Sequence, residues 1–396
     1  MVFLLMGLFC SAAQALPSLQ VYVQLTPEGQ TLKAPPGVYA GPLRVNRSIV
    51  IEGNGEVTID GGGKGTVVIV TADGAEIHNL HIINSGNSHD SVDAGILIEA
   101  DNVVCEGNVI EEVLFGIHLQ QADGCQVRGN TVTSRPHIGA LRGDGLRLWY
   151  SSDNLLENND VTLVRDVVLQ NSTGNVLRGN KITHSRMGIE LIYGPENELA
   201  DNILSYNEHG IVAIYSDEIH VHGNRIEHQS HLLGSAVAVK GSSQCVIEKN
   251  EFLDCVIGIT ANSPMFPENL LYIRDNTFAY NDIALYFYGD RGGHVLHGNR
   301  FNGNFEQVAV TASTSAVDND WRGNYWQDYQ GFDRNHDGVG DTPYSLYLYS
   351  SRLWMDRPMA KFFRGSPVLE IVDLVERLLS FADPELILSD EEPKMK

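Results

Sequence analysis

The chain has 396 residues and a formal net charge of −23 at pH 7, from 50 acidic and 27 basic residues. A protein this acidic does not bind nucleic acid through the phosphate backbone, so we expect no nucleic-acid partner. The charge suits a cation or a cationic partner, although an acidic surface more often serves solubility alone. Glycine is abundant, with 39 residues, and no apolar run after residue 15 is long enough to span a bilayer, which indicates a soluble, β-rich, secreted protein.

The N-terminus carries a short apolar segment that ends in Ala13, Gln14 and Ala15. This pattern fits a signal peptide, residues 1–15, cleaved before Leu16, and it predicts a periplasmic protein. The basic residues that usually open a signal peptide are missing here, so a start of translation further upstream stays open.

An asparagine recurs about once every two dozen residues, each time in nearly the same setting. The members of this series are Asn108, Asn130, Asn159, Asn180, Asn202, Asn224, Asn250, Asn276, Asn299 and Asn324. The residue three before each asparagine and the residue two after it are apolar, whereas the residue two before it is mostly charged. This alternation predicts short strands on either side of a turn, with apolar side chains inward. Asparagine tolerates a left-handed backbone, and stacked Asn side chains can bond along the axis.

A Gly-Ile pair recurs about nine residues after several of these asparagines, which adds a third short strand to each repeat. The pairs are Gly116-Ile117, Gly188-Ile189, Gly210-Ile211 and Gly258-Ile259. Repeats of this kind predict an all-β fold, a right-handed single-stranded parallel β-helix (a solenoid) of about 11–13 coils over residues 16–345. The four cysteines after residue 15, Cys105, Cys125, Cys245 and Cys255, are expected to be small buried apolar residues.

The strand that follows the Gly-Ile position predicts a partner-binding face. Its first and third residues should point inward and its second and fourth outward. The outward columns are then His118, Arg147, Val168, Glu190, Val212, and Gln120, Trp149, Gln170, Ile192, Ile214, flanked by Tyr150, Tyr193 and Tyr215. Trp beside Ile and Val predicts an exposed apolar stripe, and such stripes usually mark partner surfaces. Alternatively, an inserted loop around residues 134–142 covers the stripe.

Catalysis would require clustered carboxylates, or a carboxylate with Arg or His, on one outer face. The candidates are the stretches His89–Asp93, Arg142–Asp144 and Arg165–Asp166. They fall in different coils and partly in turns, where solvated Asx turns explain them equally well. We therefore assign no catalytic residue, and a polysaccharide-active enzyme or a carbohydrate-binding β-helix remains the alternative function.

Two metal sites are conceivable. His220 and His222 stand two residues apart on one outward strand face and can share a metal such as copper, although surface histidines are the more frequent reading. The spacing of Asp333, Asn335, Asp337 and Asp341 is that of a calcium-binding loop without its final Glu. The pattern fits two interpretations about equally: a calcium site and a tight Asx-rich turn.

Residues 346–396 depart from the repeat and form a C-terminal extension. Within it, residues 367–381 place apolar side chains at helical spacing opposite charged ones, which predicts an amphipathic helix. Its apolar positions are Val368, Ile371, Val375, Leu378 and Leu379. The helix either caps the open end of the β-helix or docks on a partner.

Several stretches resemble the NosD family, periplasmic copper-assembly proteins in the maturation of nitrous oxide reductase. They are Ser88–Ile96, Leu114–Ile117, Arg142–Ser151, Asn324–Tyr329, Gly331–Asp333 and Asp337–Tyr344. The resemblance runs from about residue 25 to 380, and the block after Asn324 is its most specific part.

The resemblance implies a β-helix of the carbohydrate-binding and sugar-hydrolase-like repeat type that acts without carbohydrate chemistry. It implies docking on an ABC transporter, made of a membrane permease and an ATPase, and hence association with the inner membrane through partners. A copper chaperone lipoprotein and nitrous oxide reductase are the other implied partners, with copper as a transient cargo. The C-terminal helix becomes a natural contact for the permease.

One departure concerns copper. Many members of the family resemble this chain but carry Met where Ile192 and Ile214 stand, with a His near Glu190. Thioether and imidazole groups suit Cu(I), whereas isoleucine cannot bind it. We therefore expect this face to serve protein docking more than metal binding.

Overall fold

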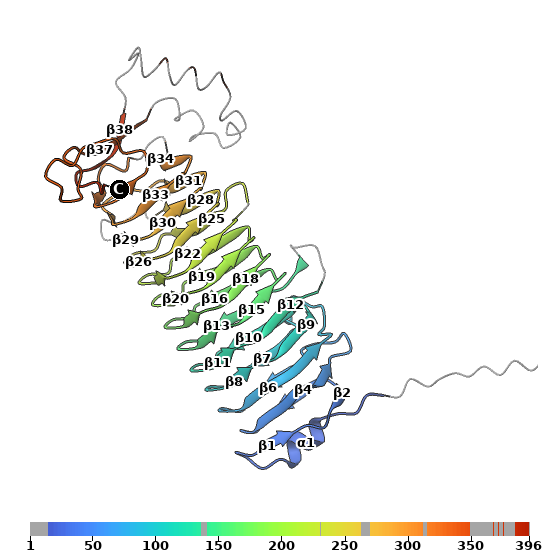
Figure 1. Ribbon diagram of the computed structural model, residues 1–396. Helices are drawn as coiled ribbons and strands as arrows, with labels where there is room; N and C mark the ends of the chain where they lie inside the picture. Colours follow the sequence, from blue (N-terminus) through green and yellow to red (C-terminus); the bar gives the residue numbers. More distant parts are fainter. Residues whose placement is uncertain are drawn as a thin grey trace, which may run out of the picture.

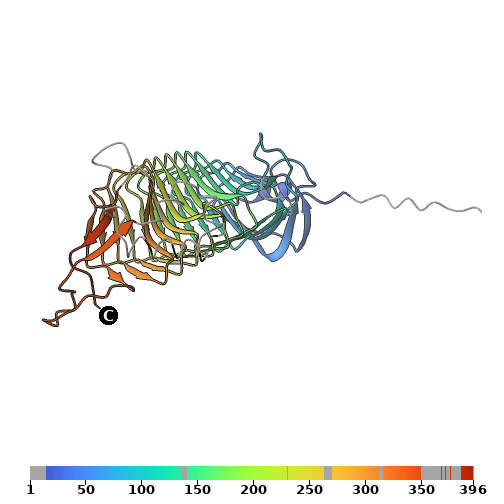
Figure 2. The ribbon, with the colours of Figure 1, turned by 90° about the horizontal axis from the view of Figure 1, so that it is seen from above.

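The computed structural model describes residues 15–135, 141–229, 231–262, 270–311, 315–348 and 385–395, together with residues 367, 371 and 375. These residues form a rod of stacked coils, with β1 at one end and β37 and β38 at the other (Figures 1 and 2). All pairings between successive coils are parallel, and the third face of the rod is a 12-stranded sheet. The predicted parallel β-helix is thus confirmed, with a coil number inside the expected range.

Most coils contribute one short strand to each of three faces. The first face holds β1 (Thr31–Lys33), β8 (Val104–Glu106), β11 (Gln126–Arg128), β14 (Leu155–Glu157), β17 (Val176–Arg178), β20 (Glu198–Ala200), β23 (His220–His222), β26 (Cys245–Glu248), β29 (Leu271–Arg274), β32 (Val295–His297) and β35 (Asp320–Arg322). The second face holds β2 (Gly37–Ala40), β9 (Val109–Val113), β12 (Thr131–Ser134), β15 (Asp160–Thr162), β18 (Lys181–Thr183), β21 (Ile203–Ser205), β24 (Arg225–Glu227), β27 (Glu251–Leu253), β30 (Thr277–Ala279), β33 (Arg300–Asn302) and β36 (Tyr325–Trp326). Two long strands, β4 (Val50–Asp60) and β6 (Glu76–Ile83), run through both of these faces.

The third face is the one on which the partner-binding surface was predicted. It holds β3 (Leu43–Val45), β5 (Val68–Val70), β7 (Ala94–Ile98), β10 (Phe115–Gln120), β13 (Leu146–Trp149), β16 (Asp166–Gln170), β19 (Met187–Ile192), β22 (His209–Ile214), β25 (Ser235–Lys240), β28 (Ile257–Asn262), β31 (Ile283–Phe287) and β34 (Glu306–Val310).

The asparagine series forms a ladder at the corner between the first and second faces. In a typical step, the backbone N–H and the side-chain Nδ2 of Asn180 both donate to Oδ1 of Asn202, at 2.9 and 3.0 Å. The same Nδ2 also donates to the carbonyl of Leu156 at 2.9 Å, so each buried amide has partners in the coils on both sides. The left-handed residue is the one before the ladder asparagine, such as Gly107 (φ 67°) or Asn158 (φ 54°), and not the ladder asparagine itself. The preceding residue turns the corner, which leaves the asparagine side chain free to point into the rod.

The core lies inside the coils, as the offsets from the asparagines predict. Every residue three before or two after a ladder asparagine is at most 2% exposed. At the C-terminal end these inward positions become aromatic, and Phe278, Phe301 and Trp326 stack with centroid separations of 5.0 and 4.2 Å. Complete burial of such side chains stabilises the folded state by about 2–3 kcal/mol each, which compensates for strands of only three residues.

Both ends of the core are covered. Val23 of the short helix α1 (Gln20–Leu25) and Leu19, the residue before that helix, are fully buried at the N-terminal end. At the other end, β37 (Tyr344–Leu348) pairs antiparallel with β38 (Glu385–Asp390), and Ile387 and Leu388 of β38 are buried. The predicted extension therefore supplies a capping strand, a role for which the sequence pattern suggested only a helix.

Candidate functional site

The register of the third face places the predicted outward residues in two columns. Arg147 lies beside Val168, which lies beside Glu190, and in the second column Trp149, Gln170, Ile192 and Ile214 follow one another. Their inward neighbours, such as Leu148 and Leu191, are fully buried.

The exposure expected of the first column requires a correction. His118, Val168 and Val212 point outward, yet they are only 3–5% exposed. Neighbouring strands lie about 4.8 Å apart, so long side chains such as Arg147 and Glu190 cover the smaller residues between them. Gln120, Trp149, Ile192 and Ile214 of the second column are half-buried rather than fully exposed. The stripe expected around Trp149 is therefore narrower than its sequence pattern suggests.

The most exposed apolar surface of this face lies at its edge, one residue beyond the second column. Tyr150, Tyr193 and Tyr215 are 53%, 55% and 58% exposed, and we call these three residues the tyrosine ridge. Each has a positive φ, between 48° and 51°, which turns its ring out of the sheet. The rings of Tyr193 and Tyr215 stack at 5.4 Å and 11°, and Tyr150 packs edge-on against Trp149 at 5.2 Å.

Gly241 continues the ridge by one coil and explains why the stack stops. It has a φ of 60°, and a Cβ at this position would come within 2.6 Å of the Tyr215 ring. The ring of Tyr215 therefore lies over a backbone that carries no side chain. Since ring contacts hold Tyr193 and Tyr215 in place, the ridge presents a preorganised surface.

The opposite edge of the same face carries a chain of ion pairs. Asp144, which is fully buried, accepts from Arg147 at 2.8 Å and from Arg165 at 2.7 Å. Arg165 also contacts Asp166 at 3.2 Å, and Arg186 bonds Asp166 through both its Nε and a terminal nitrogen. The chain ends where Arg186 approaches Glu190 at 3.6 Å.

The sequence stretches weighed as catalytic candidates, Arg142–Asp144 and Arg165–Asp166, are thus brought together by the fold. Burial raises the pKa of Asp144, and the guanidinium groups of Arg165 and Arg147 oppose that rise. Burial, followed by the charge of Asp166, raises the pKa of Glu190. Each carboxylate faces at least one arginine, an arrangement that locks the edge of the sheet. The repeat carried a signal for this network, because Arg165 and Arg186 both stand six residues after a ladder asparagine.

His118 stands out among the buried polar groups of this face. Both of its ring nitrogens are buried and have no hydrogen-bond partner. Burial, together with the nearby charge of Arg147, lowers its pKa from 6.5 to about 4. The side chain is therefore neutral at pH 7.

The histidines considered for copper lie on the first face. The rings of His220 and His222 are 4.3 Å apart, and each ring has its own acidic neighbour: Glu248 at 3.4 Å and Glu198 at 3.2 Å. Within the part of the chain that the structure describes, no three His, Cys, Asp or Glu side chains are grouped so that they could hold a metal ion. This geometry fits the alternative interpretation, in which His220 and His222 are ordinary polar side chains on the surface of the first face.

The loop considered for calcium is held by its own backbone. Oδ1 of Asp333 accepts from the N–H groups of His336 and Asp337, and Asp341 accepts from that of Arg334 at 2.7 Å. Asn335 donates to Asp337 at 2.9 Å. These bonds are those of an Asx-rich turn, and calcium binding here receives no support from the arrangement.

The four cysteines are free and buried, as expected. Burial raises the pKa of Cys105, Cys245 and Cys255 to about 12 and that of Cys125 to about 11. They are inert core residues rather than ligands.

The ends of the chain bear less on the site. The predicted signal peptide, residues 1–15, lies outside the described residues except for Ala15, as do Val368, Leu378 and Leu379 of the predicted docking helix. Ile371 and Val375 have helical backbone, and Ile371 is 59% exposed. In the described residues no helix has the length and apolarity needed to cross a bilayer.

Coils stacked in parallel register on three faces place this chain in the class of right-handed parallel β-helix proteins, with an exposed aromatic ridge at the edge of one face. The family model described as periplasmic copper-binding protein (NosD) matches residues 131–331, and the model of the right-handed β-helix region matches residues 46–161. The chain belongs to the NosD family.

Two curated relatives extend the match over most of the chain. A probable ABC transporter binding protein NosD from Pseudomonas aeruginosa is 28% identical over 86% of this chain and 82% of its own length. The protein of the same name from Stutzerimonas stutzeri is 27% identical over 94% of this chain and 89% of its own length. Both names describe an accessory protein and not an enzyme. Among solved structures, the tailspike protein of E. coli bacteriophage HK620 shares the fold, with a TM-score of 0.54 and 13% identity over 76% of this chain and 65% of that one.

Proposed function

We propose that this chain is a periplasmic accessory protein in the maturation of nitrous oxide reductase. It docks on an ABC transporter, consisting of a permease and an ATPase, and assists copper delivery to the reductase together with a copper chaperone lipoprotein. Membership of a family described as periplasmic and copper-binding supports the copper-related role. The names of the two relatives support the transporter as a partner.

The tyrosine ridge is the observation that carries the docking proposal. Exposed, preorganised aromatic rings are the side chains that contribute most to protein interfaces, because they bury much area and lose little rotamer entropy. Trp149, Ile192 and Ile214 lie half-buried beside the ridge and widen the apolar strip. We assign the permease to this strip and leave the C-terminal helix, residues 367–381, as a second proposed contact.

In this proposal copper is cargo that the partners carry. Ile192 and Ile214, in the outward column of the third face, have no side-chain atom that can bind copper. At the edge of the same face, the rings of Tyr193 and Tyr215 stack on each other. The rod then acts by holding the chaperone and the reductase at a fixed distance from the transporter.

Co-purification with the permease and ATPase of the same organism tests the proposal. The double variant Tyr193→Ala/Tyr215→Ala is expected to reduce recovery of the permease about tenfold, since two central aromatic contacts are lost. The matched control is Tyr206→Ala/Tyr280→Ala, which removes two tyrosines of similar or greater exposure, 55% and 72%, from the edge that follows the second face. Equal recovery for both double variants would contradict docking through the ridge.

A copper titration addresses the second half of the proposal. We expect no tight stoichiometric Cu(I) binding by the purified protein. Tight binding that is lost in the variants His220→Ala or His222→Ala would show that this chain is itself a copper carrier.

A further inference from the structure

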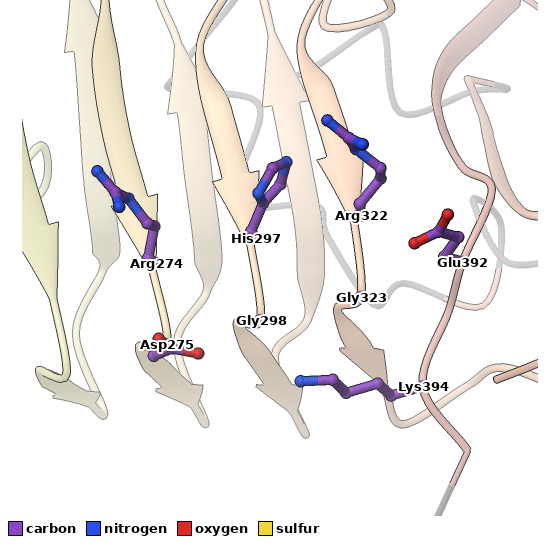
Figure 3. A pocket seen from close by; sticks show the side chains of 8 residues that line it. All are labelled: Arg274, Asp275, His297, Gly298, Arg322, Gly323, Glu392 and Lys394. Atoms are coloured by element: carbon purple, nitrogen blue, oxygen red, sulfur yellow. The ribbon is translucent and has the colours of Figure 1, made fainter. Parts of the chain in front are cut away.

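The strands at each end of a β-helix carry backbone groups that have no further coil to bond to. At the C-terminal end, residues near the end of the chain cover such groups. The N–H of Gly323 donates to the carbonyl of Glu392 at 3.1 Å. Two residues further on, the N–H of Lys394 donates to the carbonyl of Asn324 at 2.9 Å. Figure 3 shows the segment with Glu392 and Lys394 running alongside the strand with Arg322 and Gly323, so a segment added in the manner of a strand covers this end.

At the N-terminal end of the rod, the chain covers edge groups on the first strands of two faces. On β3, Oε1 of Gln20 accepts from the backbone N–H of Arg44 at 2.8 Å, and Nε2 of Gln20 donates to the carbonyl of the same residue at 2.9 Å. On β2, the N–H of Ala40 donates to the carbonyl of Pro17 at 2.8 Å. The segment that contains α1 therefore takes up backbone groups at the edges of β3 and β2.

The first strand of the first face, β1, has an open edge. The carbonyl of Gln30 and the N–H of Ala34, at the two ends of β1, both bond to β4, at 3.1 and 3.3 Å. Because the backbone groups of alternate residues in a strand point to the same side, Leu32 also faces β4, whereas Thr31 and Lys33 face away from it. Within the described ranges, no residue bonds to the outward N–H and C=O groups of Thr31 and Lys33. Both residues are exposed, so these backbone groups are accessible to a ligand.

A hollow of about 550 Å³ lies beside this edge, between α1, the turn that follows it, and β1. Its apolar lining includes Tyr22 and Leu25 of α1. Leu25 is 76% exposed, more than any other large apolar side chain in the described part of the chain, and Tyr22 is 46% exposed. Lys33 is the one charged residue that lines the hollow.

The helix that forms one wall of the hollow is held in place from two directions. Leu19 and Val23 anchor it in the core, where both are fully buried. Nη1 of Arg47 donates to the carbonyl of Gln24 at 2.9 Å and so fixes the last turn of the helix. The apolar wall therefore exists before any ligand arrives, which lowers the entropy cost of binding.

We propose that β1 binds an extended segment of a partner protein by strand addition, with an apolar side chain of that segment in the hollow beside Tyr22 and Leu25. The backbone groups of Thr31 and Lys33 suit an extended chain, which presents matching groups at the same spacing. The hollow suits the apolar side chain, and the ammonium of Lys33 favours a carboxylate next to it. This site is separate from the tyrosine ridge and does not depend on a role in reductase maturation.

The charges of the first coil favour an acidic partner segment over a second copy of this chain. Residues 15–49 contain three bases, Lys33, Arg44 and Arg47, and one acid, Glu28. Two copies paired edge to edge at β1 would bring two such positive ends together, whereas an acidic segment is attracted. The remainder of the rod is acidic, but charges further away than about 8 Å are largely screened at physiological ionic strength.

Fluorescence anisotropy with labelled peptides tests this site on the protein that begins at Leu16, the form expected after signal cleavage. The first probe is a blocked peptide of alternating threonine and valine, with a leucine at its centre and an aspartate beside the leucine. Two further probes carry N-methyl groups on either the odd or the even residues, which removes the backbone donors on one side of the extended peptide. We expect the unmethylated peptide and one methylated peptide to bind, and the other methylated peptide to bind about tenfold more weakly.

Two variants of Lys33 separate the backbone from the charge. Lys33→Pro removes an edge N–H that has no partner among the described residues, and proline is tolerated on edge strands, so binding should fall about tenfold while the fold is kept. Lys33→Thr keeps the N–H and removes only the charge, so binding should fall about threefold. Thermal unfolding without peptide checks that each variant is folded.

A matched pair on α1 tests the apolar hollow. Leu25→Ser removes the most exposed part of its apolar wall and should weaken peptide binding about tenfold. The control is Val21→Ser, which replaces an apolar side chain of the same helix that is 57% exposed and does not line the hollow, and it should leave binding unchanged.

Absence of peptide binding, equal affinity for all three peptides, or an equal loss in Leu25→Ser and Val21→Ser would overturn the proposal. Analytical ultracentrifugation tests the second copy as occupant, and we expect a monomer. A dimer of the unaltered protein that is lost in Lys33→Pro would assign the edge to a second copy and overturn the proposal as well.

Discussion

His118 shows that pointing outward and being solvated are separate properties on the third face. The strand alternation directs its side chain away from the core, while Arg147 in the next coil lies directly beside it. The imidazole therefore loses contact with water without gaining a hydrogen bond. Because burial disfavours the charged form of the ring, the pKa of His118 falls to about 4. Where a side chain points follows from the local backbone, but how much water reaches it depends on which residues occupy the neighbouring coils.

The lowered pKa predicts a stability that depends on pH. In the unfolded chain His118 binds a proton below about pH 6.5, whereas in the folded protein it does so only below about pH 4. Between these values the unfolded state holds more protons, so stability falls as the pH falls from 6.5 towards 4. The full loss corresponds to roughly 3 kcal/mol from this residue.

Urea unfolding at pH 7, 5.5 and 4.5 measures this effect. The variant His118→Leu should lose less stability than the unaltered protein across this range, while retaining the share of His209, whose pKa is also lowered to about 4 by burial and by His231. Gln120→Leu provides the control, since it replaces a half-buried polar side chain of the same strand that does not titrate, and it should leave the pH dependence unchanged. The same pH dependence in His118→Leu as in the unaltered protein would refute the assignment.

Strands of three residues hold their places in this rod because the corner ladder and the core fix them from both sides. The ladder ends at Asn324, so the acceptor for this last asparagine has to come from outside the repeat. Asp390 of β38 takes that place: its Oδ2 accepts from the backbone N–H and the Nδ2 of Asn324, at 3.1 and 3.0 Å, and from Nε1 of Trp326 at 3.0 Å. The end strand thus substitutes one carboxylate for the next repeat.

Loss of that carboxylate should open the last coil. Asp390→Ala leaves two buried donors without an acceptor, the backbone N–H of Asn324 and Nε1 of Trp326, while Nδ2 of Asn324 keeps its bond to the carbonyl of Leu296. This loss is expected to destabilise the end of the rod by about 2 kcal/mol. Asp390→Asn restores the ladder residue and should cost much less. Hydrogen exchange followed by mass spectrometry on peptides that cover β36 and β38 reports the local opening.

For the control, Glu391→Ala removes the neighbouring exposed carboxylate, which among the described residues accepts a side-chain hydrogen bond only from Ser389. It should leave exchange at β36 unchanged. Equal protection in Asp390→Ala and Glu391→Ala would mean that the ladder does not depend on this cap.

The contrast between the ladder and its cap also shows how far the sequence predicts this protein. The inward positions follow from spacing within about ten residues of each asparagine, and all of them are buried. The pairing of Asn324 with Asp390 spans 66 residues and lies outside any repeat, so no local pattern announces it. The repeat marks Arg165 and Arg186 by their shared offset but does not mark their partner Asp144, since 29 residues separate Asn130 from Asn159 where 21 separate Asn159 from Asn180. Such an insertion shifts every position that is counted from the preceding asparagine.

The molecule as a whole is a one-dimensional stack in which each coil contacts the coils before and after it. In the part of the chain that the structure describes, the strand pairings along all three faces join successive coils only, as from β17 to β20 and from β20 to β23. Stability in such a rod is approximately a sum over coils and over the contacts between neighbours. The fold then requires that each coil keep its strand register with the coils next to it, and it does not require any particular coil.

Deletion of one complete coil tests this property. Glu198 pairs in register with His220, so removal of residues 198–219 joins Asn197 to His220 and preserves every ladder position. We expect a folded protein with a melting temperature lower by about 2–5 °C, because one coil and one interface are lost. Removal of residues 198–208 instead brings β22 to the position of β20, which turns the inward positions of every later strand out of register and should abolish folding. Circular dichroism and thermal unfolding compare the two deletions. If both fold, or if neither does, the coils are not the independent units that the strand register indicates.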